Sequence, residues 1–467
     1  MTNMLKYNRG ESMLNIRKEI EASFNDMIKD LETLVSYNSV LDLDTANVNQ
    51  PFGKANKEVL DEMLAIGERD GFVTKNIDGY AGHIDIGSGE DVIAILGHLD
   101  IVPVNESGWE TNPFKLTLKD GKYYGRGTSD DKGPLLYGYY AAKILNQLGL
   151  IKDKTIRIIF GCNEETGSKC MKYYFSKEPY PNMGFTPDAN FPVVYGEKKG
   201  VGVTFKGNCA TQDLISLNAG TVVNIVPEKA TAVLSKPKSF FEDTFTSFIK
   251  QKGVEGKLIE ENGITTIELI GKSSHASLPH LGINAVVVLS EYLSTMIDHP
   301  VVQFINQYFK DDYEAKRLGF GFEGQMGVLT CNVGIVHFNE GQLEIKLDIR
   351  SPHELDEKYM VECLDKVSKE YSFTFDYNVG AHLFVDPNSK LIQSLHKAYI
   401  ECSGDVEALP QAIGGGTYAK TMPNCVAFGP EFPGTDNQIH QNNEFMDIEE
   451  AKKAIEIYAN ALFNLMK

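Results

Sequence analysis

Two apolar segments of this chain end in residue types that bind metal ions. Residues 91–97 are mostly aliphatic and lead into His98-Leu-Asp100, and residues 154–160 lead, a few positions on, into Glu164-Glu165. Short runs rich in Ile and Val, with glycine near the end, are typical of buried strands in a parallel sheet. The carboxyl ends of such strands are where ligands bind in open α/β sheets. The two segments therefore predict an α/β fold with a metal-dependent hydrolytic site at the edge of its sheet.

Length and charge limit the kinds of partner. The 467 residues are enough for two or three domains. The formal net charge of -19 argues against a nucleic-acid or anionic-membrane partner, because both favour a basic surface. No apolar run approaches the roughly 18 residues needed to cross a bilayer. Seven cysteines are scattered without a close C-x-x-C pair, which favours reduced thiols and a cytoplasmic location.

The apolar pattern divides the chain into segments of two kinds. Strand and helix patterns alternate through residues 14–199 and again through residues 385–467, as in an α/β domain with a mixed, mostly parallel sheet and flanking helices. Residues 200–384 have the pattern of an α+β domain, which we expect to be a lid inserted into the first. The expected helices cover residues 14–35, 57–70, 134–148, 240–251, 284–297, 354–369, 389–401 and 447–466. The expected strands cover residues 72–75, 82–86, 91–100, 154–160, 201–207, 220–226, 265–270, 343–349, 373–378 and 425–428.

Each candidate functional residue also has an ordinary structural interpretation when taken alone. His98 and Asp100 face the same way on a strand, which is common for a simple ion pair. The glycine-rich segment around Asp130 can be a solvated turn before a helix. The glutamate pair can be a surface acidic pair, and Asp188 and His440 are unremarkable alone. Together they supply imidazole and carboxylate donors at strand ends and loops, a set that suits Zn²⁺, Mn²⁺ or Co²⁺.

Motifs along most of the chain resemble one known family. They are Gly97-His-Leu-Asp100, Gly108-Trp109 with Asn112-Pro-Phe114, Gly125-Arg-Gly-Thr-Ser-Asp-Asp-Lys-Gly133, Glu164-Glu-Thr-Gly167, Pro187-Asp188, Ser273-Ser-His-Ala276 and Ile439-His440. Their order and type are similar to the co-catalytic zinc metallopeptidase family of carboxypeptidase G, aminoacylase and acetylornithine deacetylase. The long insert and the Gly414-Gly-Gly-Thr-Tyr-Ala419 segment are most similar to its carnosinase-like dipeptidase branch, which includes bacterial dipeptidase V.

The resemblance implies two divalent metal ions, with Zn²⁺ as the first choice and Mn²⁺ or Co²⁺ as alternatives. His98 and Asp188 would bind one ion, and Glu165 and His440 would bind the other. Asp130 would bridge the two ions. Three ligand carboxylates and a metal-bridging hydroxide would then balance the charge of two dications.

The resemblance also assigns roles to residues around the metals. Asp100 would orient the His98 ring, and Glu164 would be the general base. His275, from the insert, would stabilise the oxyanion, and Asn224 would bind substrate.

Arg350 has two interpretations. It lies on the polar face of an alternating strand pattern, which is compatible with a solvent-facing residue. The resemblance instead makes it a bidentate clamp on a substrate carboxylate.

The implied activity is that of a cytoplasmic dipeptidase acting on dipeptides with a free C-terminus. One alternative is an N-acyl amino-acid deacylase of the acetylornithine or succinyl-diaminopimelate type. Another is an inactive binding protein on the same scaffold, although Glu164 and every expected ligand are retained. The long insert leads us to expect that His275 serves its own chain in a monomer.

Overall fold

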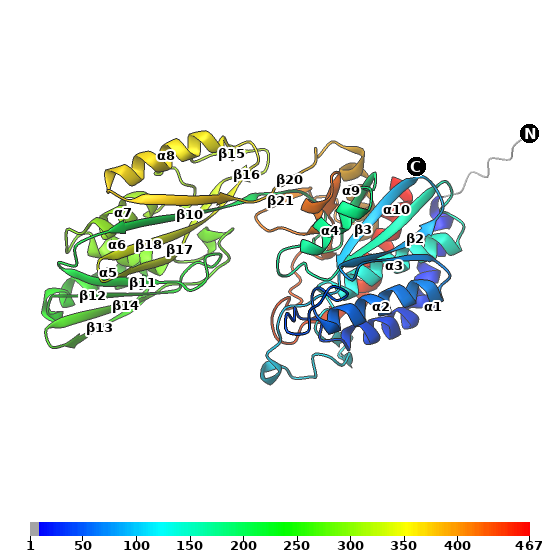
Figure 1. Cartoon of the computed structure of the whole chain (residues 1–467), viewed down its shortest axis with the longest axis horizontal. Helices are drawn as coiled ribbons and strands as arrows, with labels where there is room; N and C mark the ends of the chain where they lie inside the picture. The colour runs from blue at the N-terminus through cyan, green and yellow to red at the C-terminus, as the bar shows by residue number, and fades with distance from the viewer. Residues whose placement is uncertain (1–8) are drawn as a thin grey trace, which may run out of the picture. The chain divides into compact units, whose positions relative to one another are not determined.

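The computed structural model describes residues 9–467, which form two compact units (Figure 1). The first unit contains the described residues up to Gly196 together with Phe384–Gln411 and Gly416–Lys467. The second contains Glu197–Leu383 and the short segment Ala412–Gly415. The first unit is thus built from both ends of the chain, and the red helix α10 lies among blue and cyan elements in Figure 1.

The first unit combines a central sheet with helices. Its elements, including those at the boundary, are α1 (Arg9–Val35), α2 (Lys54–Arg69), β1 (Val73–Ile77), β2 (Ala81–Gly87), β3 (Asp91–His98), β4 (Thr117–Lys119), β5 (Lys122–Tyr124), α3 (Lys132–Gln147), β6 (Lys154–Gly161), α4 (Lys169–Lys177), β7 (Met183–Thr186), β8 (Ala189–Asn190), β9 (Val194–Glu197), β20 (Leu383–Phe384), α9 (Lys390–Ser403), β21 (Gln411–Ile413), η4 (Tyr418–Thr421), β22 (Cys425–Ala427), β23 (Pro430–Glu431), β24 (Phe445–Asp447) and α10 (Ile448–Leu465).

The central sheet is mixed, with parallel strands in its middle. Its strand order is β1-β2-β6-β3-β7-β22-β9-β20, with β21 paired to β9. Strands β6, β3, β7 and β22 run parallel, while β1 pairs antiparallel with β2, β2 with β6, and β9 with β22. Helix α3 packs closely on β3, because Gly138 has no side chain to keep it away from Ile95. Burial of β3 between neighbouring strands and helices explains its nearly continuous aliphatic sequence.

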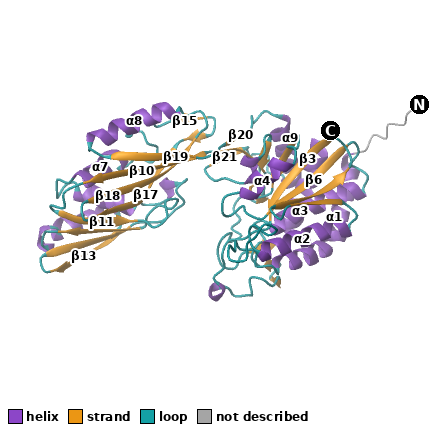
Figure 2. Cartoon of the chain, viewed as in Figure 1, coloured by secondary structure: helices purple, strands orange, loops and turns teal. Residues whose placement is uncertain are grey.

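The second unit is an antiparallel sheet with helices packed on it (Figure 2). Its elements are β10 (Lys199–Asn208), β11 (Leu214–Ala219), β12 (Lys229–Leu234), α5 (Glu242–Lys252), β13 (Glu255–Glu261), β14 (Ile264–Ile270), α6 (Ala285–Leu293), α7 (Pro300–Phe309), β15 (Glu323–Gly324), β16 (Gly327–Val328), β17 (Thr330–Asn339), β18 (Gln342–Ser351), α8 (Glu357–Glu370) and β19 (Thr374–Val379). The main sheet has the order β13-β14-β12-β11-β17-β18-β10-β19. Alternating buried residues on β10 and β18 supply one side of its apolar core.

Most expected elements are confirmed, and one strand is wrong. The mixed α/β architecture is present, and Asp447 caps α10 by accepting the backbone N–H groups of Glu449 and Glu450. Residues 220–226, expected as a strand, instead form a loop after β11. Gly220 has a φ of 72°, and the side chain of Asn332 donates to the carbonyl of Ile225 at 3.1 Å. These tertiary contacts outweigh the β-branched composition of the segment.

Two further observations apply to the described residues of both units. No helix among them is both long enough and apolar enough to cross a membrane. None of the seven cysteines forms a disulfide.

Candidate active site

Three neighbouring parallel strands of the first unit end beside one another. The register of β3 against β6 places His98 opposite Gly161, and β7 pairs with the other side of β3. His98 is the last residue of β3, Glu164 follows β6, and Asp188 follows β7. Because parallel strands end at the same edge, the fold brings these three side chains together.

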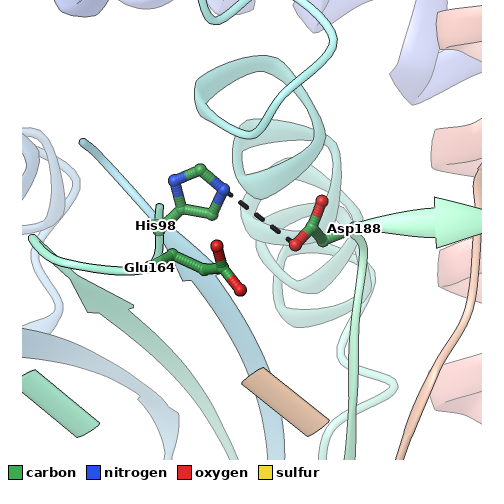
Figure 3. Close-up of side chains that lie close together, drawn as sticks. All are labelled: His98, Glu164 and Asp188. Carbon is green, nitrogen blue, oxygen red and sulfur yellow. Dashed lines mark ion pairs between the residues drawn. The ribbon is translucent and has the colours of Figure 1, made fainter. Parts of the chain in front are cut away.

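One group of side chains surrounds the Nε2 atom of His98. This atom lies 2.9 Å from Oδ1 of Asp130 and 4.0 Å from Oδ2 of Asp188. Figure 3 shows the His98 ring facing the Asp188 carboxylate, with the Glu164 carboxylate beside them. Ligand atoms of these three residues, His98, Glu164 and Asp188, all lie within 4.8 Å of one another. The expected first metal position is thus surrounded by donor atoms.

A second imidazole approaches Asp130 from another part of the chain. His440 Nε2 lies 2.8 Å from Oδ2 of Asp130 and 3.2 Å from Oε1 of Glu165. The backbone of His440 has a φ of 60°, a left-handed conformation in the loop before β24. Asp130 therefore presents one carboxylate oxygen to each histidine, which is the arrangement that a bridging ligand requires.

The donor atoms fit divalent cations. The Nδ1 atom of His98 hydrogen-bonds to the main-chain carbonyl of Asp100 at 2.9 Å, so Nδ1 carries the proton and Nε2 is left with its lone pair. That Nε2 atom is fully buried and makes no hydrogen bond, although a carboxylate oxygen of Asp130 lies near it. A buried lone pair facing several carboxylates is unfavourable without a cation between them. Nitrogen and oxygen donors of this kind suit Zn²⁺, Mn²⁺ or Co²⁺.

Asp100 contacts both the His98 ring and the loop that carries the two glutamates. Its carboxylate lies 3.5 Å from His98 Nδ1, and the closer partner of the ring is its main-chain carbonyl. The carboxylate instead accepts the backbone N–H groups of Glu164 at 2.9 Å and Glu165 at 3.1 Å. Asp100 therefore links the end of β3 to the loop that carries both glutamates.

Glu164 lies in a setting that favours proton transfer. Burial, together with the nearby charges of Asp100 and Glu165, raises the pKa of Glu164 to about 7. A carboxyl group with a pKa near neutrality can both accept and release a proton at working pH.

The second unit brings together the three residues expected from the insert. The backbone N–H of Ala276, next to His275, donates to the carbonyl of Asn224 at 2.9 Å. His275 and Arg350 are close enough that the positive charge of Arg350, after burial, lowers the pKa of His275. Asn224 and His275 are exposed, while Arg350 is half-buried. The three residues thus form one polar cluster within this unit.

Hydrogen bonds fix the orientation of His275 and Arg350. The backbone N–H of Ser277 donates to Nδ1 of His275 at 3.2 Å. Arg350 donates through Nε and Nη2 to the carboxylate of Asp348, at 2.6 and 2.8 Å, and through Nη1 to the carbonyl of Gly414 at 2.9 Å. A Cβ atom on Gly414 would lie only 2.4 Å from that of Ser277, so the close approach requires glycine.

Sequence reasoning gave no role to two residues beside the site, although Tyr418 lies in one of the family-like motifs. Tyr418 is fully buried with its ring centroid 6.0 Å from that of His98. Glu444, also fully buried, forms an ion pair with Arg126 of the glycine-rich loop. A buried arginine needs a counter-charge, but no local pattern indicates which distant carboxylate supplies it.

Comparisons with known proteins agree with these observations. Residues 94–464 match the model of peptidase family M20/M25/M40. The chain is 35% identical to "Putative dipeptidase YtjP" of Bacillus subtilis strain 168, over 97% of this chain and 100% of that protein. It is 34% identical to "Putative dipeptidase SH1171" of Staphylococcus haemolyticus, over 96% and 99% of the two chains.

A solved structure shares the fold at low sequence identity. Human carnosine dipeptidase 1 superposes with a TM-score of 0.57 at 15% identity, over 97% of this chain and 98% of that chain. The family model covers nearly the whole chain, and both bacterial relatives align over almost their full length. The chain therefore belongs to peptidase family M20/M25/M40.

Proposed function

We propose that this chain is a metal-dependent dipeptidase that hydrolyses dipeptides with a free C-terminus. Family membership makes it a hydrolase acting on peptide bonds, and the two bacterial relatives are named as dipeptidases. The observation that carries the proposal is the Asp130 carboxylate, which faces the imidazoles of His98 and His440 through different oxygens.

Five side chains would hold two divalent ions, with Zn²⁺ as the first choice. His98 and Asp188 would bind one ion, Glu165 and His440 the other, and Asp130 both. When bound, such ions lower the pKa of water and polarise a scissile carbonyl. Three carboxylates facing two dications leave the cluster positively charged, which favours an added anionic oxygen.

Glu164 would move the proton. Its carboxylate lies beside His98 and Asp188 and has a pKa near neutrality. It would accept a proton from the attacking water and deliver it to the leaving amine.

His275 would act as a hydrogen-bond donor. Its Nδ1 atom accepts the Ser277 backbone N–H, so in the neutral ring the proton is on Nε2. Burial and the charge of Arg350 lower the pKa of His275, which favours the neutral ring. Nε2–H would then stabilise the oxyanion that forms at the scissile carbonyl.

Arg350 would recognise the free carboxylate of the substrate. A guanidinium has five N–H donors, of which Asp348 and Gly414 use three. One N–H then remains on each terminal nitrogen, which matches the two oxygens of a carboxylate. We propose that Asn224, on the segment beside His275, also contacts the substrate.

Two further proposals concern the state of the protein. We place it in the cytoplasm because none of its seven cysteines forms a disulfide. We also propose that it works as a monomer, because the insert is long enough to supply the His275 that completes its own site.

A substrate panel tests the activity. Chelator-treated protein is reloaded with Zn²⁺, Mn²⁺ or Co²⁺ and assayed with dipeptides, N-acetyl amino acids and N-succinyl amino acids. The proposal predicts that dipeptides are the preferred substrates. Faster turnover of the acylated amino acids would indicate a deacylase, and binding of metal without turnover of any substrate would indicate an inactive binding protein.

A further inference from the structure

Glu444 is a buried carboxylate that contacts the loop carrying Asp130. It has no exposed surface and lies between His440 and β24. Its Oε1 atom accepts three backbone N–H groups: those of Gly127 at 3.1 Å, Ser129 at 2.8 Å and Asp130 at 3.1 Å. The N–H of Asp130 itself is therefore held by this carboxylate.

The other oxygen of Glu444 is paired with an equally buried arginine. Arg126 Nη1 donates to Oε2 of Glu444 at 2.6 Å, and Nη2 donates to the carbonyl of Gln441 at 2.9 Å. Gln441 follows His440 directly, so the guanidinium links the glycine-rich loop to the chain beside the second histidine.

Main-chain contacts join the same two segments. The N–H of Gly125 donates to the carbonyl of Glu444 at 3.1 Å, and the hydroxyl of Ser129 donates to the carbonyl of Phe445 at 2.6 Å. Residues 125–130 and 441–445 are thus connected at several points. The first segment ends at Asp130, and the second directly follows His440.

Stability alone does not account for a buried ion pair. Replacing such a pair with apolar residues of similar volume is often neutral or stabilising, because two charges must be removed from water. A buried pair that also binds several main-chain groups does fix geometry, because each of those donors and acceptors must be in place. At Glu444 the geometry that is fixed is the position of the Asp130 backbone relative to His440.

We propose that Glu444 is a positioning residue that holds the Asp130 carboxylate between His98 and His440 and thereby sets the affinity for the metal pair. The inference rests on the proposed metal-binding role of these three residues, but not on the identity of the substrate. Partners that orient metal ligands typically contribute 10- to 100-fold in metal affinity.

The test is Glu444→Gln, measured by titration of chelator-treated protein with Zn²⁺. The glutamine carbonyl can still accept backbone N–H groups, but its amide N–H₂ group faces the N–H of Arg126, donor against donor. We expect the dissociation constant for Zn²⁺ to rise by about 10- to 100-fold. The absorption spectrum of the Co²⁺-loaded protein should also change, because the ligand geometry changes. Excess metal should restore binding, since mass action offsets a weaker affinity.

Glu450→Gln is the matched control. Glu450 is a carboxylate six positions after Glu444, in the first turn of α10. Its side chain accepts a hydrogen bond from the hydroxyl of Thr435 at 2.7 Å and not from the loop that carries Asp130. This variant should bind Zn²⁺ with the affinity of the unmodified protein.

Hydrogen exchange of the metal-free Glu444→Gln protein separates positioning from general stability. We expect faster exchange at residues 125–131 and 437–445 and unchanged protection elsewhere. An unchanged Zn²⁺ affinity would overturn the proposal, because Asp130 would then be positioned without Glu444. Loss of protection throughout the first unit would also overturn it, because Glu444 would then stabilise the fold as a whole. None of these measurements uses a peptide, so failure of the proposed peptidase activity would be seen separately.

Discussion

At the scale of single residues, neighbouring glutamates are expected to have different tasks. Glu165 lies 3.2 Å from His440 Nε2, the distance expected of two ligands on one ion, whereas Glu164 lies half-buried beside His98 and Asp188. The backbone N–H groups of Glu164 and Glu165 donate to the Asp100 carboxylate, and these hydrogen bonds fix the main chain of the two glutamates. The two side chains can therefore be exchanged for amides separately and compared.

Glu164→Gln should lower kcat by about 10²- to 10⁴-fold, the usual contribution of a general acid–base group, and leave the metal content unchanged. Glu165→Gln, the matched variant, should lower metal occupancy. Elemental analysis of both purified variants, beside kinetics on a dipeptide, checks this. If Glu164→Gln lost metal while Glu165→Gln kept it, the two roles would be reversed.

Arg350→Ala should raise KM for free dipeptides by about 10- to 100-fold, because losing a charge-assisted hydrogen-bond pair costs about 1.5–3 kcal/mol. A C-terminally amidated dipeptide should already be a poor substrate of the unmodified protein. Lys346→Ala is the control, since Lys346 lies on the same strand face and pairs with Glu344. Equal rates for the amide and the free acid would exclude the carboxylate clamp.

At the scale of elements, the sequence predicts strand ends better than loops. His98 and Glu164 could be placed because apolar runs precede them, and such runs indicate buried strands. The pairing of Arg126 with Glu444 could not be predicted, because the two residues are 318 positions apart and local patterns carry no such information. Residues 220–226 were assigned to a strand because Thr, Val and Ile favour strands, but contacts from Asn332 hold them in a loop.

His83 on β2 contacts Tyr174 on α4, and we expect this contact to make the stability of the first unit sensitive to acid. Burial, assisted by the charge of Arg157, lowers the pKa of His83 to about 4, and its Nδ1 atom lies 2.9 Å from the hydroxyl of Tyr174. The unfolded chain takes up this proton near pH 6.5, but the folded chain only near pH 4. The unfolded state thus binds more protons between these values, and stability falls as pH is lowered through them.

His83→Gln should reduce this pH dependence. Each pKa unit corresponds to about 1.4 kcal/mol, so His83 accounts for on the order of 3 kcal/mol of stability lost from pH 7 to pH 4. Urea unfolding midpoints of the two proteins at pH 7 and at pH 4.5 provide the measurement. Parallel decreases in both midpoints would show that His83 is not the sensitive group.

At the scale of the whole molecule, the proposed chemistry divides its residues between two units. The first unit contains the metal-ligand set and Glu164, and the second contains His275 and Arg350. Neither unit has the complete set, so turnover should require residues of both units. We expect the residues of both units in one site to come from one chain.

Mixing two inactive variants tests that expectation. His275→Ala and Glu164→Gln proteins are unfolded and refolded together, and dipeptide turnover is measured beside the mass from light scattering. We expect no recovery of activity and a mass near 51.9 kDa. Recovered activity would show that His275 acts across a subunit boundary, and the monomer proposal would be wrong.

Metal titration shows whether hydrolysis needs two bound ions. Chelator-treated protein is titrated with Zn²⁺ while dipeptide hydrolysis is followed, and the metal bound per chain is measured at each point. We expect no hydrolysis without metal and activity that rises to a plateau at two equivalents, because Asp130 faces two imidazoles and each is proposed to bind a separate ion. Full activity of the metal-free protein, or a plateau at a single equivalent, would contradict it.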